Sequence, residues 1–423
     1  MRILHLINRY WPAVGGAEAY LGEISARLVA EGHLVTVATT DADDFALFWH
    51  PRRPRLREAQ TNHAGVHIRR FPVRHMPLAP YSYVGWRIML RLLSASRVVP
   101  LSLLYRVCRF TPWVPDLWRW LEMTSETFDL VAGVTILYES IVAAGQRFAR
   151  RRGVPFVVYP LTHLGAGPRP AADAVSRYYT MCHQTDLVRQ SDAIVTLTET
   201  ERAFYIDQGV PSKRILVAGP GLVPEQILGG DGARWRTRYQ LNGPLVAFIG
   251  TINYDKGAMH LVEAIRRLWQ TGRPVEVALV GSPSDQFQEY WRSLPPAEHK
   301  RVRVLGRVDE AEKRDLLAAC DIFALPSRTD SFGIVYLEAW LYRKPVVGAR
   351  AWAIRDVIAD GQDGLLVEFG DVPGLALAIA RLLDHPEERV AMGANGERKV
   401  YRTHLWDQKF ALIRGLYTRL TGG

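Results

Sequence analysis

Two carboxylates, Asp330 and Glu338, stand eight residues apart where a buried strand passes through a polar loop into a helix. The apolar run 322–325 predicts the strand, and the glycine in the turn 332–334 predicts the helix start. Such a helix start points backbone N–H groups at one spot and favours an anion. Two carboxylates would repel a phosphate, but they suit the hydroxyl groups of a sugar. The combination predicts a nucleotide-sugar site; the plainer alternative is an ordinary strand–loop–helix unit with solvated acids at its helix start.

A second strand-to-helix loop carries a lysine. The apolar run 245–249 predicts a strand that ends at Gly250, and Lys256-Gly257 leads into a helix. A cation at this strand exit can neutralise a leaving diphosphate, whose developing charge is the main electrostatic cost of moving a sugar. The chain has seven lysines against 46 arginines, so a lysine in this loop is informative. The alternative is a solvated lysine at a helix start.

Two further loops carry residue types that suit such a ligand. His163 follows a strand predicted at 154–159, and a neutral histidine there can donate a hydrogen bond to a sugar hydroxyl. Gly15-Gly16 stands between the first strand and the first helix, where glycine lets the backbone approach a ligand closely. Each signal is weak alone, because a lone histidine is more often structural and paired glycines often only make a turn. The glycine loop matches neither a Walker phosphate loop nor a full dinucleotide-binding fingerprint.

The run from Asp330 to Glu338-Ala339 resembles the acidic motif of retaining glycosyltransferases with the GT-B fold, of the family 4 type (glycosyl transferases group 1). That motif is a carboxylate, seven residues and a glutamate. The resemblance implies that Glu338 holds the ribose hydroxyls of the donor and that Asp330 holds hydroxyls of the transferred sugar. It extends to Lys256, to His163 and to the Gly-Gly-Ala-Glu loop at 15–18, and it covers the chain except about 72–125.

The resemblance implies a donor site and a small set of catalytic residues. No metal and no cofactor besides the donor substrate are expected, because a lysine and helix N-termini can take the electrostatic role of a metal. The catalytic residues would be Lys256, His163 and Asp330. The donor would be bound by Gly15, Gly16, Gly250, Thr251, Lys256, Arg307, Val308, Asp330, Phe332, Gly333, Ile334 and Glu338.

Three positions differ from the usual sequence motifs of the family. Asp330 stands where the first motif residue is usually glutamate, and Thr251 stands where an arginine usually accompanies the lysine. A second phosphate cation would then be missing or would come from Arg328 or Arg350. Trp352 and the alanine after it replace two glycines, and an indole there would narrow the space near the nucleotide or sugar.

The elements that must position these residues alternate between strands and helices. A chain of 423 residues exceeds the usual size of one core, so two domains are expected. The fold class is α/β, GT-B, with two doubly wound parallel sheets. The predicted domains are 1–225 on the acceptor side with a variable insert at about 72–125, 226–400 for the nucleotide sugar, and a helix at 401–423 that crosses back to the first domain. The predicted strands are 3–7, 34–38, 66–71, 129–134, 154–159, 193–197, 214–217, 245–249, 275–280, 302–305, 321–325, 345–347 and 364–367.

The positive net charge of +10 is concentrated in one stretch. Residues 69–121 hold nine arginines and a single acid, Asp116, with tryptophans and tyrosines between them. This mixture suits an anionic membrane surface, with Arg87, Arg91 and Arg97 as expected contacts. A solvated basic face over buried aromatics is an equal alternative, and no recognition motif supports nucleic-acid binding. Three cysteines without metal-ligand spacing, and no signal peptide or membrane-spanning run, predict a cytoplasmic protein. If the basic stretch does meet a membrane, the protein would be peripheral on the inner face of the cell membrane.

These features together predict a metal-independent retaining glycosyltransferase. It would move a hexosyl unit from a nucleotide diphosphate sugar to a hydroxyl acceptor, lipid-linked or polysaccharide, in cell-envelope polysaccharide or glycolipid synthesis. No residue stands out as a covalent nucleophile, so a front-face mechanism is expected. Two alternatives stay open: a catalytically silent GT-B protein that binds glycans or acts as a scaffold, and a nucleotide-sugar epimerase of the same fold.

Overall fold

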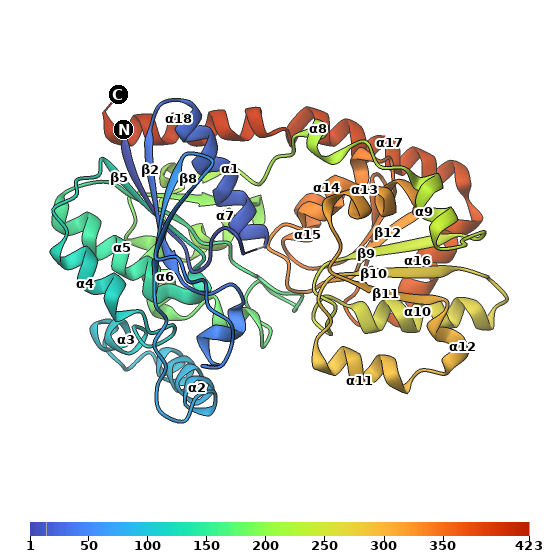
Figure 1. Cartoon of the computed structure of the whole chain (residues 1–423), viewed down its shortest axis with the longest axis horizontal. Coiled ribbons are helices and arrows are strands. Elements are labelled where there is room, and N and C mark those ends of the chain that lie inside the picture. The colour runs from blue at the N-terminus through green and yellow to red at the C-terminus, as the bar shows by residue number, and fades with distance from the viewer. Residues whose placement is uncertain (14, 423) are drawn as a thin grey trace. The chain divides into compact units, whose positions relative to one another are not determined.

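The structure is a computed structural model that describes residues 1–13 and 15–422. Its backbone contacts divide the chain into two compact units (Figure 1). The first unit comprises Met1–Thr162, Ala174–Ala218 and the residues from Phe410 onward; the second comprises His163–Asp173 and Gly219–Lys409. The segment His163–Asp173 therefore belongs with the second unit, although it directly follows a strand of the first.

The first unit is built on an eight-stranded sheet in the order β3-β4-β2-β1-β5-β6-β7-β8. Strands β5, β6 and β7 are buried along their whole length, as expected where both faces of a parallel sheet are covered. Helix α5 packs against β1, β5 and β6, and α1 packs against β2 and β4. The strands are β1 Arg2–Leu6, β2 Leu34–Thr40, β3 Gln60–His63, β4 Val66–Phe71, β5 Leu130–Val134, β6 Phe156–Tyr159, β7 Ala193–Thr196 and β8 Ile215–Val217.

One strand at the edge of this otherwise parallel sheet, β3, was not predicted. Strand β3 pairs antiparallel with β4 through a two-residue turn, Ala64-Gly65, with φ angles of 49° and 77°. Positive φ at both turn residues is typical of the tight hairpin that matches strand twist. The polar sequence of β3 and its exposed position carry no hydrophobic alternation, so periodicity could not predict it.

The helices of the first unit include three in the predicted insert, α2, α3 and α4. None of the helices that the structure describes combines the length and the apolar composition needed to cross a bilayer. The α-helices are α1 Gly16–Ala30, α2 Tyr81–Ser96, α3 Leu101–Val107, α4 Pro115–Met123, α5 Glu139–Arg152, α6 Cys182–Arg189, α7 Glu199–Asp207 and α18 Trp406–Thr421. Helix α18 belongs to this unit from Phe410 onward. Short 3₁₀ turns are η1 Phe45–Phe48, η2 Ile136–Tyr138, η3 Ser176–Tyr178 and η4 Ser212–Arg214.

The second unit is a six-stranded parallel sheet in the order β11-β10-β9-β12-β13-β14. Counted along the chain this order is 3-2-1-4-5-6, so the winding reverses between β9 and β12. Ligands of such sheets bind beyond the carboxyl ends of the strands at this reversal. The strands are β9 Leu245–Ile249, β10 Glu276–Val280, β11 Val302–Gly306, β12 Ile322–Leu325, β13 Val346–Ala349 and β14 Gly364–Val367. The helices are α8 Pro224–Ile227, α9 Gly232–Arg238, α10 Ala258–Gln270, α11 Asp285–Ser293, α12 Pro296–His299, α13 Glu310–Ala319, α14 Ile334–Leu341, α15 Ile354–Val357, α16 Val372–Asp384 and α17 Pro386–Thr403.

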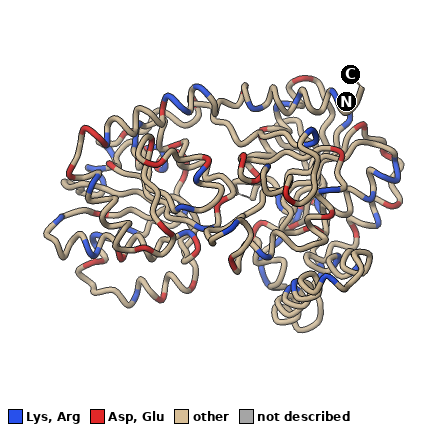
Figure 2. Tube along the Cα trace, turned by 180° about the vertical axis from the view of Figure 1, so that it is seen from behind, with Lys and Arg blue, Asp and Glu red and all other residues tan. Residues whose placement is uncertain are grey.

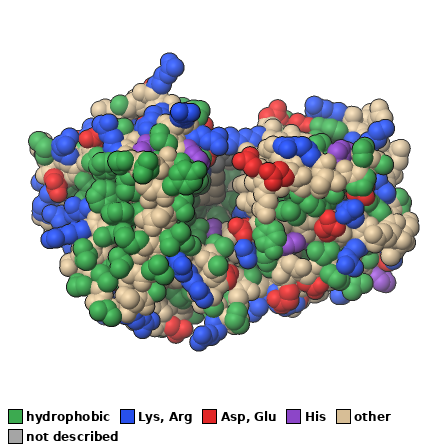
Figure 3. Space-filling model, turned by 90° about the horizontal axis from the view of Figure 1, so that it is seen from below, with side chains coloured by type: hydrophobic (Ala, Val, Ile, Leu, Met, Phe, Trp, Pro, Cys, Tyr) green, Lys and Arg blue, Asp and Glu red, His purple; other side chains and the backbone are tan. Residues whose placement is uncertain are grey.

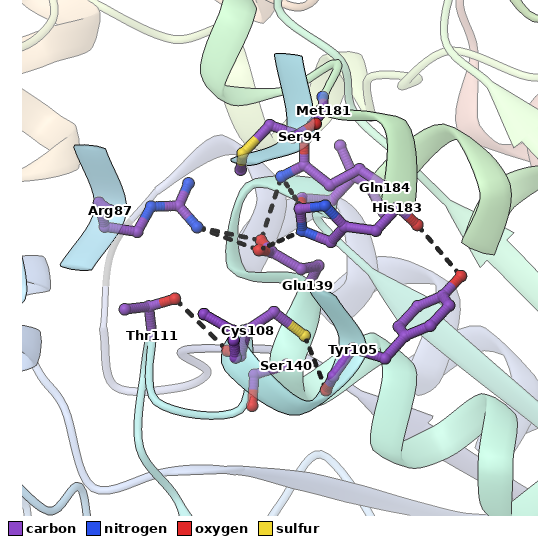
Figure 4. A network of polar contacts seen from close by, with 12 residues as sticks. Arg87, Ser94, Tyr105, Cys108, Thr111, Glu139, Ser140, Met181, His183 and Gln184 are labelled. Carbon is purple, nitrogen blue, oxygen red and sulfur yellow. Dashed lines mark hydrogen bonds and ion pairs between the residues drawn. The ribbon is translucent and has the colours of Figure 1, made fainter. Parts of the chain in front are cut away.

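The basic stretch is only partly a surface feature. Arg87 on α2 is 7% exposed, and its guanidinium lies 3.2 Å from both carboxylate oxygens of Glu139 (Figure 4). His183 Nε2 and Gln184 Nε2 approach the same carboxylate at 3.0 Å. Arg70 is also buried and donates to backbone carbonyls. Arg87 is therefore a structural residue that holds α2 against α5, and its expected contact with a membrane is wrong.

Candidate functional site

The carboxyl ends of β9 and β12 are joined by their loops. The backbone N–H of Arg328 donates to the Asp255 carbonyl at 3.0 Å, and its guanidinium pairs with the Asp255 carboxylate at 2.7 Å. Gly257 has a φ of 77°, and a β-carbon there would lie 2.3 Å from the Pro326 carbonyl oxygen. Only glycine fits this close approach at this backbone conformation. The two loops therefore meet at the reversal of winding, where a ligand is expected.

Lys256 and Asp330 face each other across these two loops. The lysine Nζ lies 2.6 Å from Oδ1 of Asp330, while the side-chain oxygen of Asn253 accepts from the Lys256 backbone N–H at 2.8 Å. Burial alone would raise the pKa of Asp330, but Lys256, together with smaller contributions from Ser327 and His163, outweighs burial and holds that pKa below its usual value. Oδ2 of Asp330 is buried and has no hydrogen-bond partner among the described residues. Asp330 is thus an ionised acceptor with one oxygen available.

Glu338 on α14 is likewise a buried carboxylate paired with a lysine. The side chain is 8% exposed, and Oε1 lies 3.3 Å from Nζ of Lys313 on α13. Burial raises the pKa of Glu338 more than Lys313 lowers it. Oε2 of Glu338 is buried and accepts no hydrogen bond from any described residue. Lys313 was not among the predicted site residues, and the scarcity of lysine in the chain is the one sequence signal that marks it.

Glycines begin the two helices at this edge. Gly257 precedes α10 and Gly333 precedes α14 with a φ of 80°, and neither helix has a side-chain cap. Helices α11, α13 and α16 of the same unit begin instead at a serine or aspartate whose side chain accepts a backbone N–H. Uncapped N–H groups at a helix start are suited to bind phosphate. Of the predicted turn, Phe332 is buried against the ring of His404 and Ile334 is the first residue of α14.

His163 lies in the segment that joins the second unit. Burial and the charge of Lys256 lower its pKa to about 4, so its imidazole is neutral at pH 7. Trp352 holds this segment: its backbone N–H donates to the Gly165 carbonyl at 3.0 Å, and its indole N–H donates to the Gly167 carbonyl at 2.9 Å. The tryptophan that replaces a family glycine therefore anchors the segment that carries His163.

The remaining predicted residues lie in two places. Gly250 and Thr251 follow β9, and Arg307 follows β11, where its Nε donates to the Ser282 hydroxyl at 2.8 Å. Val308 comes next, so all of these lie at the same edge of the second sheet. Arg328 and Arg350, the expected substitutes for a second phosphate cation, are both paired with carboxylates: Arg328 with Asp255, and Arg350 with Asp360 at 2.6 Å and Glu368 at 3.3 Å.

Gly15 and Gly16 lie in the first unit, at the start of α1. A β-carbon at Gly15 would lie 2.2 Å from Oε2 of Glu18, whereas one at Gly16 would meet nothing within 4 Å. Glu18 is buried and pairs with Arg9 at 2.7 Å. In residues 1–13 and 15–422, no cluster of three or more His, Cys, Asp or Glu side chains is placed to hold a metal ion.

Comparisons with known proteins identify the family. The model for glycosyl transferases group 1 matches residues 243–385, and the model for the glycosyl transferase 4-like domain matches residues 15–221. A D-inositol 3-phosphate glycosyltransferase of Corynebacterium efficiens is 32% identical over 253 residues, which are 57% of this chain and 59% of that protein. The corresponding protein of Acidothermus cellulolyticus is 30% identical over 292 residues, 64% of each chain. The chain thus spans about three fifths of the length of such relatives.

Solved structures share the fold at low sequence identity. Anabaena Alr3699/HepE in complex with UDP and glucose superposes with a TM-score of 0.72 at 18% identity, over 99% of this chain and 100% of that one. Sucrose-phosphate synthase of Thermosynechococcus elongatus gives 0.72 at 19% identity, over 100% and 99%. The chain belongs to the group 1 glycosyltransferases of the family 4 type and has the GT-B fold.

Proposed function

We propose that this protein transfers a hexosyl unit from a nucleotide diphosphate sugar to a hydroxyl acceptor with retention of configuration. The observation that carries the proposal is the pair of buried carboxylates, Asp330 and Glu338. Each has one oxygen held by a lysine and a second oxygen with no partner among the described residues. A buried acceptor left unpaired costs about 1–3 kcal/mol, which a ligand hydroxyl would recover. Sugar and ribose hydroxyls supply such donors, and phosphate does not.

The donor would lie along the carboxyl edge of the second sheet. Its diphosphate would meet the uncapped starts of α10 and α14 and the ammonium of Lys256, so the negative charge that develops on the leaving group is stabilised without a metal ion. The ribose would donate to Oε2 of Glu338, and the transferred sugar would donate to Oδ2 of Asp330. Neutral His163 would hydrogen-bond a sugar hydroxyl and help to orient the anomeric carbon.

The proposed chemistry is a front-face displacement. The bond between the anomeric carbon and the phosphate oxygen breaks, and its electron pair stays on the diphosphate. The acceptor oxygen forms the new bond on the same face, and its proton passes to the leaving phosphate oxygen. Lys256 would stabilise the diphosphate throughout, which is the largest electrostatic contribution that this chain's side chains can make.

The acceptor is the least constrained part of the proposal. The relatives are named for D-inositol 3-phosphate, and a solved neighbour binds UDP-glucose, so a hydroxylated acceptor and a nucleotide diphosphate sugar are the expected classes. The basic stretch 69–121 of the first unit, with nine arginines and a single acid, supports a lipid-linked or polysaccharide acceptor of the cell envelope, reached from the membrane surface. A catalytically silent glycan-binding role is the second candidate, because Thr251 lacks the second cation and Arg328 and Arg350 are already paired.

The test combines donor screening with one matched pair of variants. Purified protein is incubated with nucleotide diphosphate sugars and hydroxyl acceptors, and nucleotide release and product configuration are followed by NMR. Glu338→Gln should weaken nucleoside diphosphate binding, whereas Glu310→Gln should not, since Glu310 also contacts Lys313 but is exposed. An epimerase would change the sugar without releasing nucleotide. A silent binding protein would bind the nucleotide and release nothing, and either result would replace the proposed transfer.

A further inference from the structure

Helix α2 has a buried face and, opposite to it, an exposed face. The inward face is formed by Tyr83, Arg87, Leu90 and Ser94, which are buried. The outward face carries an exposed stripe, which we call the α2 stripe: Tyr81, Val84, Ile88 and Leu92 are 84%, 51%, 41% and 56% exposed. A helix that only met water on this face would carry polar residues there. The α2 stripe therefore calls for an apolar partner.

The stripe is part of a larger exposed apolar surface. Leu78 before α2, and Val98 and Leu103 after it, are 84%, 85% and 46% exposed. Of the sixteen large hydrophobic side chains that are exposed in the described part of the chain, seven lie between residues 78 and 103. Figure 3 shows hydrophobic side chains gathered on this part of the first unit, where Figure 1 places α2 at the lower edge. Concentration of this kind marks a docking surface rather than scattered surface residues.

A hollow opens beside the stripe and shares two residues with it. Its volume is about 320 Å³, at the small end of the range for ligand pockets. Val84 and Ile88 belong to both the stripe and the wall of the hollow, so the two surfaces are continuous. We call it the aromatic hollow, because four of its wall residues are aromatic. It is lined by Trp49, Tyr83, Val84, Arg87, Ile88, Leu137, Tyr138 and Tyr178.

The wall of the hollow is nearly uncharged, but it contains one hydroxyl group that lacks a hydrogen-bond partner among the described residues. Arg87 is neutralised by Glu139, whose pKa stays low because Arg87 and His183 outweigh the effect of burial (Figure 4). Tyr83 is 8% exposed, and its hydroxyl has no hydrogen-bond partner among the residues that the structure describes. A buried hydroxyl without a partner is costly unless a ligand supplies one. The hollow thus suits an apolar chain with an acceptor oxygen near one end.

The charge around the stripe has one sign. No Asp or Glu occurs between Glu58 and Asp116, as the colours along this part of the trace show in Figure 2. Arg91, Arg97 and Arg106 form no ion pair with any described carboxylate, and Arg91 reaches over the ring of Tyr178 at 5.7 Å. Tyr178 also lines the hollow, so an unpaired cation stands at its rim. A partner with both an apolar part and a negative charge complements this surface.

We propose that the α2 stripe and the aromatic hollow bind an anionic lipid, with an acyl or isoprenoid chain in the hollow and its phosphate near Arg91. Exposed apolar side chains enter the interface of a bilayer, while neighbouring arginines are attracted to its anionic head groups. A soluble acidic protein would satisfy the arginines but would leave the hollow empty. The binding of this lipid does not depend on the proposed function. A role for the lipid as the acceptor of the transferred sugar would rest on that function.

The first test measures partitioning of the full chain onto vesicles. We expect binding to phosphatidylcholine vesicles that contain phosphatidylglycerol, little binding to phosphatidylcholine alone, and weakening by salt. Arg91→Gln with Arg97→Gln should lower partitioning about tenfold or more. Ile88→Asn with Leu92→Asn should lower it as well. The matched control is Leu377→Asn with Val390→Asn, a pair that is 71% and 66% exposed on helices of the second unit and should change nothing.

The second test addresses the hollow with a single-chain probe. Lysophosphatidylglycerol below its micelle concentration should change the fluorescence of Trp49, and Trp49→Phe should remove that change. Tyr83→Phe deletes only the unpartnered oxygen and should weaken the probe without lowering the unfolding temperature. The hollow would be overturned as a lipid site if lysophosphatidylglycerol left the fluorescence of Trp49 unchanged and Tyr83→Phe did not weaken binding of this probe. The α2 stripe would be overturned as a lipid-binding surface if the unmodified chain failed to bind anionic vesicles at low salt. The same conclusion would follow if Leu377→Asn with Val390→Asn reduced binding as much as the α2 variants do. Nucleoside diphosphate binding, read in the same samples, tests the proposed function separately.

Discussion

Replacing Lys313 with methionine should weaken nucleoside diphosphate binding by changing the charge state of Glu338. The lysine Nζ lies 3.3 Å from Oε1 of Glu338, whose side chain is 8% exposed. Burial raises the pKa of Glu338, and Lys313 is the main influence that opposes this rise. Without the lysine, burial would raise the pKa of Glu338 further, so a larger fraction of its carboxyl would be protonated at any given pH. A neutral carboxyl accepts weaker hydrogen bonds from ribose hydroxyls than a carboxylate does.

The expected loss of nucleoside diphosphate affinity follows from the strength of the hydrogen bonds that Glu338 would accept. Hydrogen bonds to a charged group contribute about 1.5–3 kcal/mol, which corresponds to roughly a 10- to 150-fold rise in Kd. Calorimetry from about pH 4 upward, which begins near the usual pKa of a glutamate, would compare a nucleoside diphosphate with its 2′-deoxy analogue. In the unmodified chain, affinity should rise with pH through the raised pKa of Glu338, because the ionised form binds. In Lys313→Met this rise should move to higher pH, and the preference for ribose over deoxyribose should shrink.

Lys344→Met provides the matched control. Lys344 also lies in the second unit, but its Nζ donates to the Ala318 carbonyl at 2.9 Å, so its loss should leave the binding profile unchanged. The reasoning is refuted if Lys313→Met binds the nucleotide with unmodified affinity and an unshifted pH dependence. An equal loss for ribose and deoxyribose would show that Lys313 acts on the phosphates and not through Glu338.

Three further predictions address turnover, the loop contact and pH. Lys256→Ala should lower turnover by about 2–4 kcal/mol of transition-state stabilisation with little change in unfolding temperature, and near-normal turnover in the purified variant would contradict its role. Gly257→Ala should destabilise the chain by about 1–3 kcal/mol because of its φ of 77° and the Pro326 carbonyl, whereas Gly272→Ala, with the same φ and nothing within 4 Å, should cost less; denaturant titration compares them. Burial lowers the pKa values of His5 and His404 to about 3, so the unfolded state binds more protons between pH 3 and 6.5, and stability should fall with acidification through this window. His5→Asn should flatten the thermal-unfolding profile there, and an unchanged slope would count against this assignment.

The fold could be predicted where the sequence is locally periodic. Every strand predicted in the first unit is present, and the strands of the second unit agree to within a few residues. The central strands, such as β5, β7, β9 and β12, are almost wholly apolar on both faces, which is the pattern of a covered parallel sheet. Strand β3 was missed because it is polar and exposed, and because its pairing depends on a turn at Ala64-Gly65 rather than on its own composition.

The site could be predicted only as far as strand exits are visible in the sequence. Lys256 and Asp330 were both assigned from their loops, and the structure brings them to 2.6 Å because β9 and β12 are neighbours. Lys313 lies in the middle of a helix, where a lysine is ordinarily solvated, so no local pattern marks it. Arg87 looks basic and exposed in the sequence, and only its distant partner Glu139 shows that it is buried.

The two lysine–carboxylate pairs give the ends of the site different responses to protons. Lys256 keeps the pKa of Asp330 low, whereas burial keeps the pKa of Glu338 high despite Lys313. On the proposed function, the ribose end therefore loses its charge first as pH falls, while the sugar end remains ionised. Acidification should then weaken capture of the nucleotide before it disturbs orientation of the sugar. Burial is the main reason why the pKa of His163 is lowered, and the charge of Lys256 lowers it further, so the lysine that helps to keep Asp330 ionised also favours the neutral imidazole of His163.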